Sequence, residues 1–408
     1  MRPPEVRPMR ILHSNAGGAL RIAIGTCLLV VALLGAPVLA GEAELHGVAE
    51  RVGQGLAYPC DPEPFNSRVD FTPTAYAVVD ELGIARDKVL AGFLNGLHGV
   101  DIGSTLCAAS GPGVEFGLVK SETLDGKLEA TYRVRSSEGL NYFKFVFEEY
   151  DGRVVISDVW NYMTAVRLSE NLQDTLVEMT RKRNLVERIF SYGQSWMDYI
   201  GRHDKVMKDI AEGNYGRAHS ELERIPEAVL NGRHFLLVRF HLALAEGDWE
   251  SRLELSDRLA ELAGERPEVD LLVLDARIEQ GQFDAAEAGV LRLREHLGDP
   301  YLEVIQANIL ILAGNLSEAR VATEAALAAN EAEGLWPLLS LEVLEEDADG
   351  AFEALDRMRA ELDVDPGEVL LEFMFAGEPF SRFVDSRRFK KWSKRANREI
   401  RKKQASSP

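Results

Sequence analysis

Polar residues that could bind a ligand recur at a nearly constant interval in the second half of the chain. His241, Asp275 and Asn308 each stand six residues before a glycine, at successive intervals of 34 and 33 residues. His234 and Tyr301 stand thirteen residues before such a glycine and are expected to flank the same row. One charged or polar group from each repeated unit suits a surface that binds an extended partner. We therefore predict that these five residues line a binding groove for a protein or peptide.

A second interpretation of this row stays open. Phe235, Val238 and Leu242 have the spacing of a buried helical stripe. A shift of the register by one residue would then place the polar residues on the side of a helix.

Neither metal chemistry nor catalysis is indicated by the sequence. His203, His234 and His241 lack the i, i+4 spacing of a helical metal chelate, and a zinc site needs three or four converging ligands. The sequence has no Gly-x-x-x-x-Gly-Lys-Ser/Thr loop, no dinucleotide fingerprint after a strand and no Gly-x-Ser-x-Gly elbow. We therefore predict a protein that is not an enzyme and that has neither a metal nor a cofactor.

The first 40 residues have the pattern of an export signal. Basic residues precede an apolar run from Ile22 to Leu34, and Ala-Pro-Val-Leu-Ala follows, ending at Ala40. This order predicts export to the periplasm or outside the cell, with cleavage after Ala40. The alternative is that the segment is retained as an N-terminal membrane anchor.

Two cysteines, Cys60 and Cys107, lie beyond the predicted cleavage site. Disulfides persist in the compartments that exported proteins reach, which favours a bridge between them. Two free thiols are the alternative.

Charge is distributed unevenly along the chain. The formal net charge is −20, yet residues 1–40 carry +3 and residues 387–408 carry +9, which leaves −32 on the residues between them. An acidic body repels nucleic acid, so we expect no nucleic-acid partner. The basic end, residues 393–408, is predicted to be a flexible tail. It is either solvated, in contact with an anionic surface such as a membrane or a cell-wall polymer, or docked on the acidic body.

Residues 41–166 combine helical and strand patterns. Helices are expected at Glu42–Ala57 and within Phe65–Leu97, with an irregular stretch over Gly99–Gly113. Stretches rich in Val, Tyr and Phe then predict four strands, at Val114–Lys120, Lys127–Arg135, Asn141–Tyr150 and Val154–Met163. Asp151-Gly152 between two of them is a hairpin signal. The sequence thus predicts an α+β domain with helices followed by a four-stranded antiparallel meander.

This domain resembles the nuclear transport factor 2-like cones. The resemblance rests on the order of the elements and on Gly139-Leu140-Asn141-Tyr142, Asp151-Gly152 and Asp158-Val159-Trp160-Asn161-Tyr162. It implies a cone that could bind a small ligand or perform a simple acid/base reaction, with the later helices as a docking arm. His46, His98, Asp101 and Asp158 could then reach the interior. The alternative is an unrelated small α+β domain.

Residues 195–375 resemble tetratricopeptide repeats. Gly213, Gly247, Gly281 and Gly314 lie 34, 34 and 33 residues apart, and Tyr, Trp, Phe or Leu follows each glycine by two positions. A small residue follows by five positions in three of the repeats, whereas the second repeat has Arg252. Prolines stand between the predicted hairpins, at Pro226, Pro267 and Pro300.

The resemblance implies an all-α solenoid whose concave face binds proteins. A fifth loop is expected at Asp349–Ala354, a connecting helix over 167–194 and a capping helix over 376–392. Within the cap, Phe383, Phe389 and Trp392 are expected to cover the last repeat. The function predicted from the sequence is an exported, non-catalytic scaffold for protein–protein interaction.

Overall fold

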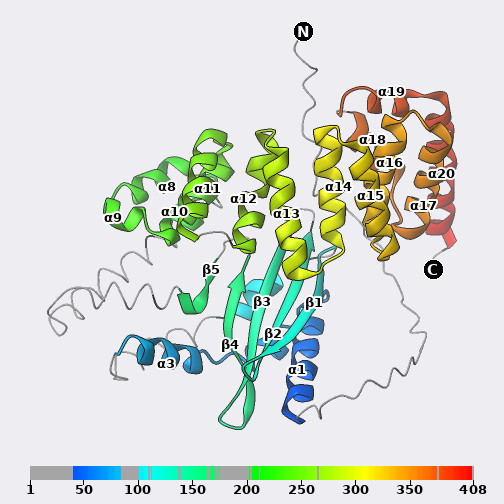
Figure 1. Cartoon of the computed structure of the whole chain (residues 1–408). Coiled ribbons are helices and arrows are strands. Elements are labelled where there is room, and N and C mark those ends of the chain that lie inside the picture. Colours follow the sequence, from blue (N-terminus) through cyan, green and yellow to red (C-terminus); the bar gives the residue numbers. More distant parts are fainter. Residues whose placement is uncertain are drawn as a thin grey trace.

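The structure is a computed structural model that describes most of the chain in one antiparallel sheet and the helices around and after it (Figure 1). The described residues are 40–83, 101–108, 111, 113–136, 139–162, 166–170, 173, 202, 205–210, 212–263, 266–374 and 376–406. The predicted export signal before Ala40 and most of the connecting helix predicted over 167–194 lie outside them.

The sheet follows the predicted meander. Its strands are β1 (Glu115–Leu124), β2 (Lys127–Ser136), β3 (Gly139–Tyr150), β4 (Arg153–Asn161) and the short β5 (Val166–Arg167). They pair in sequence order, and every pair is antiparallel. The predicted four-stranded antiparallel sheet is thus confirmed, and β5 adds a fifth strand of two residues at its edge.

Asp-Gly turns close two hairpins of this sheet. Asp125 and Gly126 join β1 to β2, and Asp151 and Gly152 join β3 to β4. All four have positive φ, between 51° and 77°. This conformation matches the right-handed twist of the strands and explains why Asp-Gly marks a hairpin in the sequence.

Helices cover one face of the sheet. α1 (Ala40–Leu56) packs against β1, β2 and β3 beside α2 (Glu63–Asn66), whereas α3 (Thr72–Glu81) packs against β4. α5 (Ile102–Ala108) forms where the sequence predicted irregular structure, because Asp101 accepts a hydrogen bond from the Ser104 backbone N–H at its start. Aromatic and aliphatic side chains fill the space between α1, α2 and the sheet, including Leu45, Val52, Phe65, Phe116, Tyr132, Phe145, Phe147 and Ile156.

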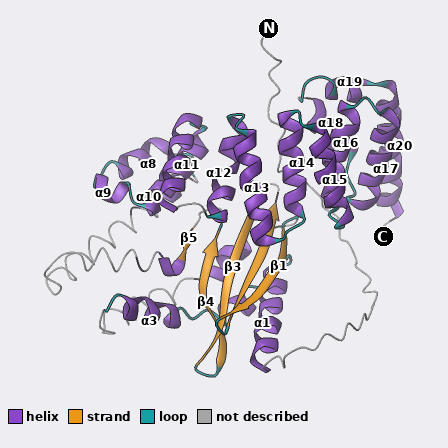
Figure 2. Cartoon of the chain, viewed as in Figure 1, coloured by secondary structure: helices purple, strands orange, loops and turns teal. Residues whose placement is uncertain are grey.

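The second half of the described chain is helical (Figure 2). Its helices are α8 (Tyr215–Leu222), α9 (Glu227–Leu230), α10 (Arg233–Glu246), α11 (Trp249–Ala263), α12 (Pro267–Glu279), α13 (Phe283–Leu297), α14 (Tyr301–Ala313), α15 (Leu316–Ala328), the 3₁₀ turn η1 (Ala332–Gly334), α16 (Leu335–Leu344), α17 (Ala348–Glu361), α18 (Pro366–Met374), α19 (Phe380–Asp385) and α20 (Arg387–Ser406). From α10 to α17 each helix packs against the next.

The four regularly spaced glycines end the first helix of successive hairpins. Gly213, Gly247, Gly281 and Gly314 have φ between 70° and 81°. Each glycine and the residue after it donate backbone hydrogen bonds to carbonyls three and five residues earlier, as in a Schellman motif. The recurring glycine is therefore the residue that lets each helix stop and the next one begin.

The fifth turn lies earlier than predicted. Glu346 has a φ of 60°, and Glu346 and Asp347 make the same pair of hydrogen bonds as the glycine turns. Asp349 and Gly350, expected in the loop, instead belong to the first turn of α17. The small residue five positions after the turn is Ala351, which is buried. The loop was predicted too late in the chain because Gly350 is the expected turn residue, whereas Glu346 adopts the left-handed conformation.

The C-terminal end is more ordered than predicted. The expected cap over 376–392 consists of α19 and the start of α20, and the helix continues to Ser406 through the predicted flexible tail. Phe389, Trp392 and Ala396 are buried on one side of α20, and Arg395 pairs with Asp356 at 2.8 Å. These contacts hold the helix to the preceding ones and account for its continuation.

Candidate functional site

The three polar residues of the predicted groove occupy matching positions on successive first helices. His241 on α10, Asp275 on α12 and Asn308 on α14 each precede the turn glycine by six residues. Asp275 is exposed, whereas His241 and Asn308 are partly buried. The matching residue of the next hairpin, Ser340, is 1 % exposed. Met207, the matching residue before Gly213, is also partly buried but apolar, so the accessible polar part of the row lies on α10, α12 and α14.

Asp275 is an exposed carboxylate that lies beside a buried cation. Its side chain is 50 % exposed, and its carboxylate lies 3.8 Å from the Arg252 guanidinium. Burial nevertheless raises the pKa of Asp275, and the charge of Arg252 only partly offsets this effect. Such a group can accept hydrogen bonds from a cationic or amide-bearing partner.

Arg252 contacts residues of both neighbouring helices, α10 and α12. In the sequence it stands out only because the other repeats have a small residue at this position. Its guanidinium is 5.6 Å from the centre of the Phe240 ring and 3.3 Å from the Glu279 carboxylate. Arg252 is 5 % exposed, so its charge is held between α10, α11 and α12. Asp275 and Glu279 lie one helical turn apart on α12. This spacing of two acidic residues is the feature of the sequence that could have indicated a cation beside them.

Tyr301, thirteen residues before Gly314, faces the sheet. Tyr301 is 7 % exposed, and the guanidinium groups of Arg133 and Arg135 each lie 5.1 Å from the centre of its ring. Tyr301 therefore does not flank an open groove, because strand β2 covers it. His234 is in α10, but its side chain lies outside the described part of the structure.

The same position in the neighbouring hairpins is also buried at the sheet. Glu268 is 2 % exposed and Glu333 is 5 % exposed. Glu333 pairs with Arg135 at 2.9 Å, and the charge of Lys144 acts on Glu268. Burial still raises the pKa of Glu268, whose Oε2 atom has no hydrogen-bond partner among the described residues. Three successive connections between helical hairpins thus meet one end of the sheet (Figure 1).

Arg133 links two of these connections to the sheet. One of its nitrogens lies 2.9 Å from Asp299 and 3.0 Å from Glu331, and the other lies 2.8 Å from Glu115. Asp299 also accepts a 2.7 Å hydrogen bond from the buried Tyr142 hydroxyl. We call Arg133, Glu115, Tyr142, Asp299 and Glu331 the junction cluster. It fixes the position of the helices relative to the sheet.

Apolar contacts and a neutral histidine complete this junction. Leu140 and Tyr142 of β3 and Tyr162, just after β4, share a buried core with residues of α12, α13 and α14. The Tyr162 hydroxyl lies 3.2 Å from His296 Nε2. Burial and the charges of Lys144 and Lys120 lower the pKa of His296, so its imidazole is neutral at pH 7.

The residues considered for the cone interior are engaged in local structure. Asp158 is 3 % exposed and pairs with Arg167 at 2.7 Å. Asp101 accepts hydrogen bonds from Ser104 and Asn66, which lower its pKa and make it a weaker base. His46 lies 3.3 Å from the Ser121 hydroxyl, and His98 is outside the described residues. The structure does not bring these four residues together as one described site.

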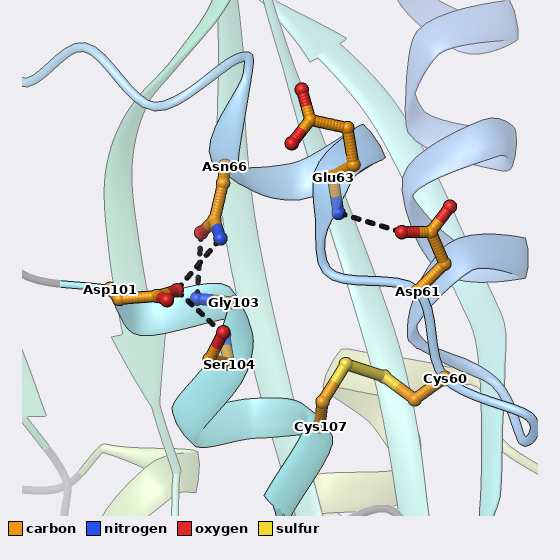
Figure 3. The surroundings of a disulfide bond; sticks show 8 residues. All are labelled: Cys60, Asp61, Glu63, Asn66, Asp101, Gly103, Ser104 and Cys107. Atoms are coloured by element: carbon orange, nitrogen blue, oxygen red, sulfur yellow. Dashed lines mark hydrogen bonds between the residues drawn. A yellow bond between two sulfur atoms is a disulfide. The ribbon is translucent and has the colours of Figure 1, made fainter.

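A disulfide joins Cys60 to Cys107 and ties α5 to the loop between α1 and α2 (Figure 3). Their Cα atoms are 5.4 Å apart. Asn66 at the end of α2 holds the start of α5 as well, because its side chain donates to Asp101 at 2.7 Å and accepts from the Gly103 backbone at 2.9 Å. A Cβ atom at Gly103 would lie 2.4 Å from the Asn66 side-chain oxygen, so a larger residue there would force Asn66 to shift.

Neither a metal cluster nor a membrane-spanning helix occurs in the described parts of the chain. No group of three or more His, Cys, Asp or Glu residues there could hold a metal ion. Of the described helices, none combines the length and the apolar character needed to cross a bilayer. Of the three histidines considered for a metal, His203 lies outside the described residues.

Comparisons of this chain with models of protein families, with characterised proteins and with solved structures gave no match. The site is therefore interpreted from its own geometry.

Proposed function

We propose that this chain is an exported, non-catalytic scaffold that binds a protein or peptide along its helical repeats. The repeats would form a tetratricopeptide-like solenoid, and the binding face would consist of α10, α12 and α14. The sheet domain would act as a rigid base for these repeats. A partner that presents cationic or amide groups fits the acidic residues of this face.

Repetition of the local geometry supports the proposed architecture. Five turns, from Gly213 to Glu346, share the same backbone hydrogen bonds. A buried alanine stands five residues after four of them, at Ala218, Ala286, Ala319 and Ala351. Small residues at this place let the two helices of a hairpin approach closely. Stacked units of this kind present an extended surface to a partner.

The observation that carries the proposed function is the row of accessible polar side chains at matching positions of successive first helices, in which Asp275 is half-exposed. The sheet occupies the ends of the repeats at Asp299, Glu331 and Glu333, so it leaves the Asp275 side chain open. Arg252 and Glu279 beside it supply further charge. An exposed acidic group flanked by partly exposed polar residues at matching repeat positions favours binding over a purely structural role.

The proposal can be tested by affinity capture from the extracytoplasmic fraction of the source cells with the full chain. A triple variant, His241→Ala, Asp275→Ala and Asn308→Ala, should retain at least about tenfold less partner, as expected for the loss of several central contacts. A matched control is His219→Ala, Asp257→Ala and Ser317→Ala, because these residues are exposed on the second helices α8, α11 and α15. The control removes the same net charge and should bind like the wild type.

Equal capture by the triple variant and the wild type would refute this binding face. Loss of capture in both variants would point to the fold or to overall charge. N-terminal sequencing of the exported protein tests the location separately. A chain that starts at Gly41 indicates cleavage, whereas an intact N-terminus indicates an anchor.

A further inference from the structure

Helix α20 has two faces that differ in chemistry. The inner face carries Phe389, Trp392 and Ala396, which are at most 5 % exposed. The Trp392 indole N–H donates to Asp356 at 2.8 Å, and Arg359 pairs with Glu399 at 2.7 Å. This face is fixed to α17 and its neighbours, so the opposite face of the helix has a defined orientation.

The outer face is a continuous row of positive charge. Its residues are spaced three or four positions apart, with one additional neighbour at the end: Arg387, Lys391, Lys394, Arg398, Arg401 and Lys402. All six are exposed, and none forms an ion pair with another residue that the structure describes. With a rise of 1.5 Å per residue the row is roughly 22 Å long. We call these six residues the basic row.

The basic residues at the sides of α20 behave differently. Arg388 pairs with Asp349 at 2.7 Å, Lys390 with Asp385 at 3.1 Å and Arg395 with Asp356 at 2.8 Å. Those three contribute to docking of the helix on the protein. The basic row makes no such contribution, so its charge is available to an external partner.

We propose that the basic row is a docking surface for a layer of anionic lipid headgroups. Positive side chains are attracted to a negatively charged leaflet, and the attraction falls within a Debye length. The row contains no apolar residue, so it would rest on the headgroups without entering the acyl region. It is also straight, which suits a planar surface.

The position of α20 makes this contact compatible with an acidic protein. Figure 1 shows α20 at the end of the helical array, on the side away from the sheet. At physiological ionic strength, charges more than about 8 Å from the lipid are largely screened. Acidic residues farther away than this therefore do not oppose contact by this helix. Those beside or on the helix, namely Asp349, Asp356, Asp385 and Glu399, are each paired with a cation. A nucleic acid is disfavoured because the export signal predicts a compartment without one.

Co-sedimentation of the full chain with lipid vesicles tests the proposal. One set contains phosphatidylcholine alone, and the other contains about 30 % phosphatidylglycerol, which gives a negative surface potential. The neutral vesicles measure binding by the apolar N-terminal segment. The wild type should bind the anionic vesicles more strongly at about 0.1 M salt, and about 0.5 M salt should remove the difference.

A triple variant, Lys391→Gln, Lys394→Gln and Arg398→Gln, should lose the preference for anionic vesicles by about tenfold or more. The control is Lys205→Gln, Lys208→Gln and Arg217→Gln, which are exposed on the first hairpin and remove the same charge. The control should behave like the wild type. Circular dichroism verifies that both variants are folded.

Three outcomes would overturn the proposal. The first is a row variant that prefers anionic vesicles as strongly as the wild type does. The second is a control variant that loses as much binding to anionic vesicles as the row variant. The third is a wild type that ignores anionic vesicles. If that wild type binds heparin or DNA through the basic row, the row is a site for a soluble polyanion. Failure of any of these tests leaves the binding face on α10, α12 and α14 untouched.

Discussion

Arg133 on β2 and Asp299 before α14 form a 2.9 Å ion pair although 166 residues separate them in the chain. The Arg133 side chain is 12 % exposed and that of Asp299 only 2 %. A buried pair of this kind adds little stability over an apolar substitute, but removal of one partner leaves a charge without compensation. The pair therefore specifies how the sheet and the helices fit together.

Replacement of Arg133 by methionine should lower the free energy of unfolding by about 3–5 kcal/mol. Asp299 and Glu331 would remain buried at the junction without their cation. Chemical denaturation followed by circular dichroism measures the loss. Arg153→Met is the control, because Arg153 pairs with Asp70 but its side chain is 52 % exposed, and it should cost less than about 1 kcal/mol. A loss below 1 kcal/mol for Arg133→Met would show that the junction cluster is not required for the fold.

Arg252→Ala should destabilise the repeats by about 2–3 kcal/mol, although alanine is the residue that the repeat pattern favours here. The substitution leaves a cavity beside Phe240 and removes the cation from Asp275 and Glu279. Thermal unfolding with hydrogen exchange of α10–α12 measures the effect. Arg217→Ala on α8, at an exposed position, is the control. An unchanged or increased stability would mean that the guanidinium has no structural role.

Reduction of the Cys60–Cys107 bond should destabilise the sheet domain by up to about 4 kcal/mol, the chain-entropy value for a loop of this length. Denaturation curves with and without dithiothreitol measure the change. Cys60→Ser should give the same stability in both conditions. A wild type that does not respond to the reductant would show that the closed loop does not contribute.

Local pattern was sufficient to predict the strands and most turns of this protein. The Asp-Gly hairpin and the glycines at 213, 247, 281 and 314 are local signals, because a left-handed turn depends on the residue that adopts it. The fifth turn was misplaced because Glu346 adopts this conformation without being glycine. The sequence thus indicates where helices stop only when the usual residue is present.

The junction could not be predicted from the same information. The position of Tyr301 in its repeat is regular. The surface that covers Tyr301 belongs to a sheet more than 160 residues earlier in the chain, and the repeat pattern does not indicate how that sheet packs on the helices. Arg133 and Arg135 look like ordinary strand residues until their acidic partners are known. The row of His241, Asp275 and Asn308 depends only on the repeat register, so the sequence could nominate it.

Glu368 on α18 should make the stability of the protein depend on pH. Burial, with the charges of Asp365, Asp363 and Glu333, raises its pKa from 4.5 to about 7. The fold therefore disfavours the ionised form, and stability falls as the pH rises from about 4.5 to about 7. The full shift corresponds to about 3 kcal/mol, and the partial exposure of the side chain reduces this to about 1 kcal/mol.

Glu368→Gln should consequently be more stable than the wild type at pH 8 by about 1 kcal/mol and equal to it at pH 4. Urea denaturation across this range measures the difference. Glu353→Gln, at an exposed position of α17, controls for the loss of one negative charge and should show no such pH-dependent gain. Parallel curves for wild type and Glu368→Gln at every pH would contradict the raised pKa. A variant that is less stable than the wild type at pH 8 would reverse the sign of the shift, because it would mean that the fold favours the ionised carboxyl.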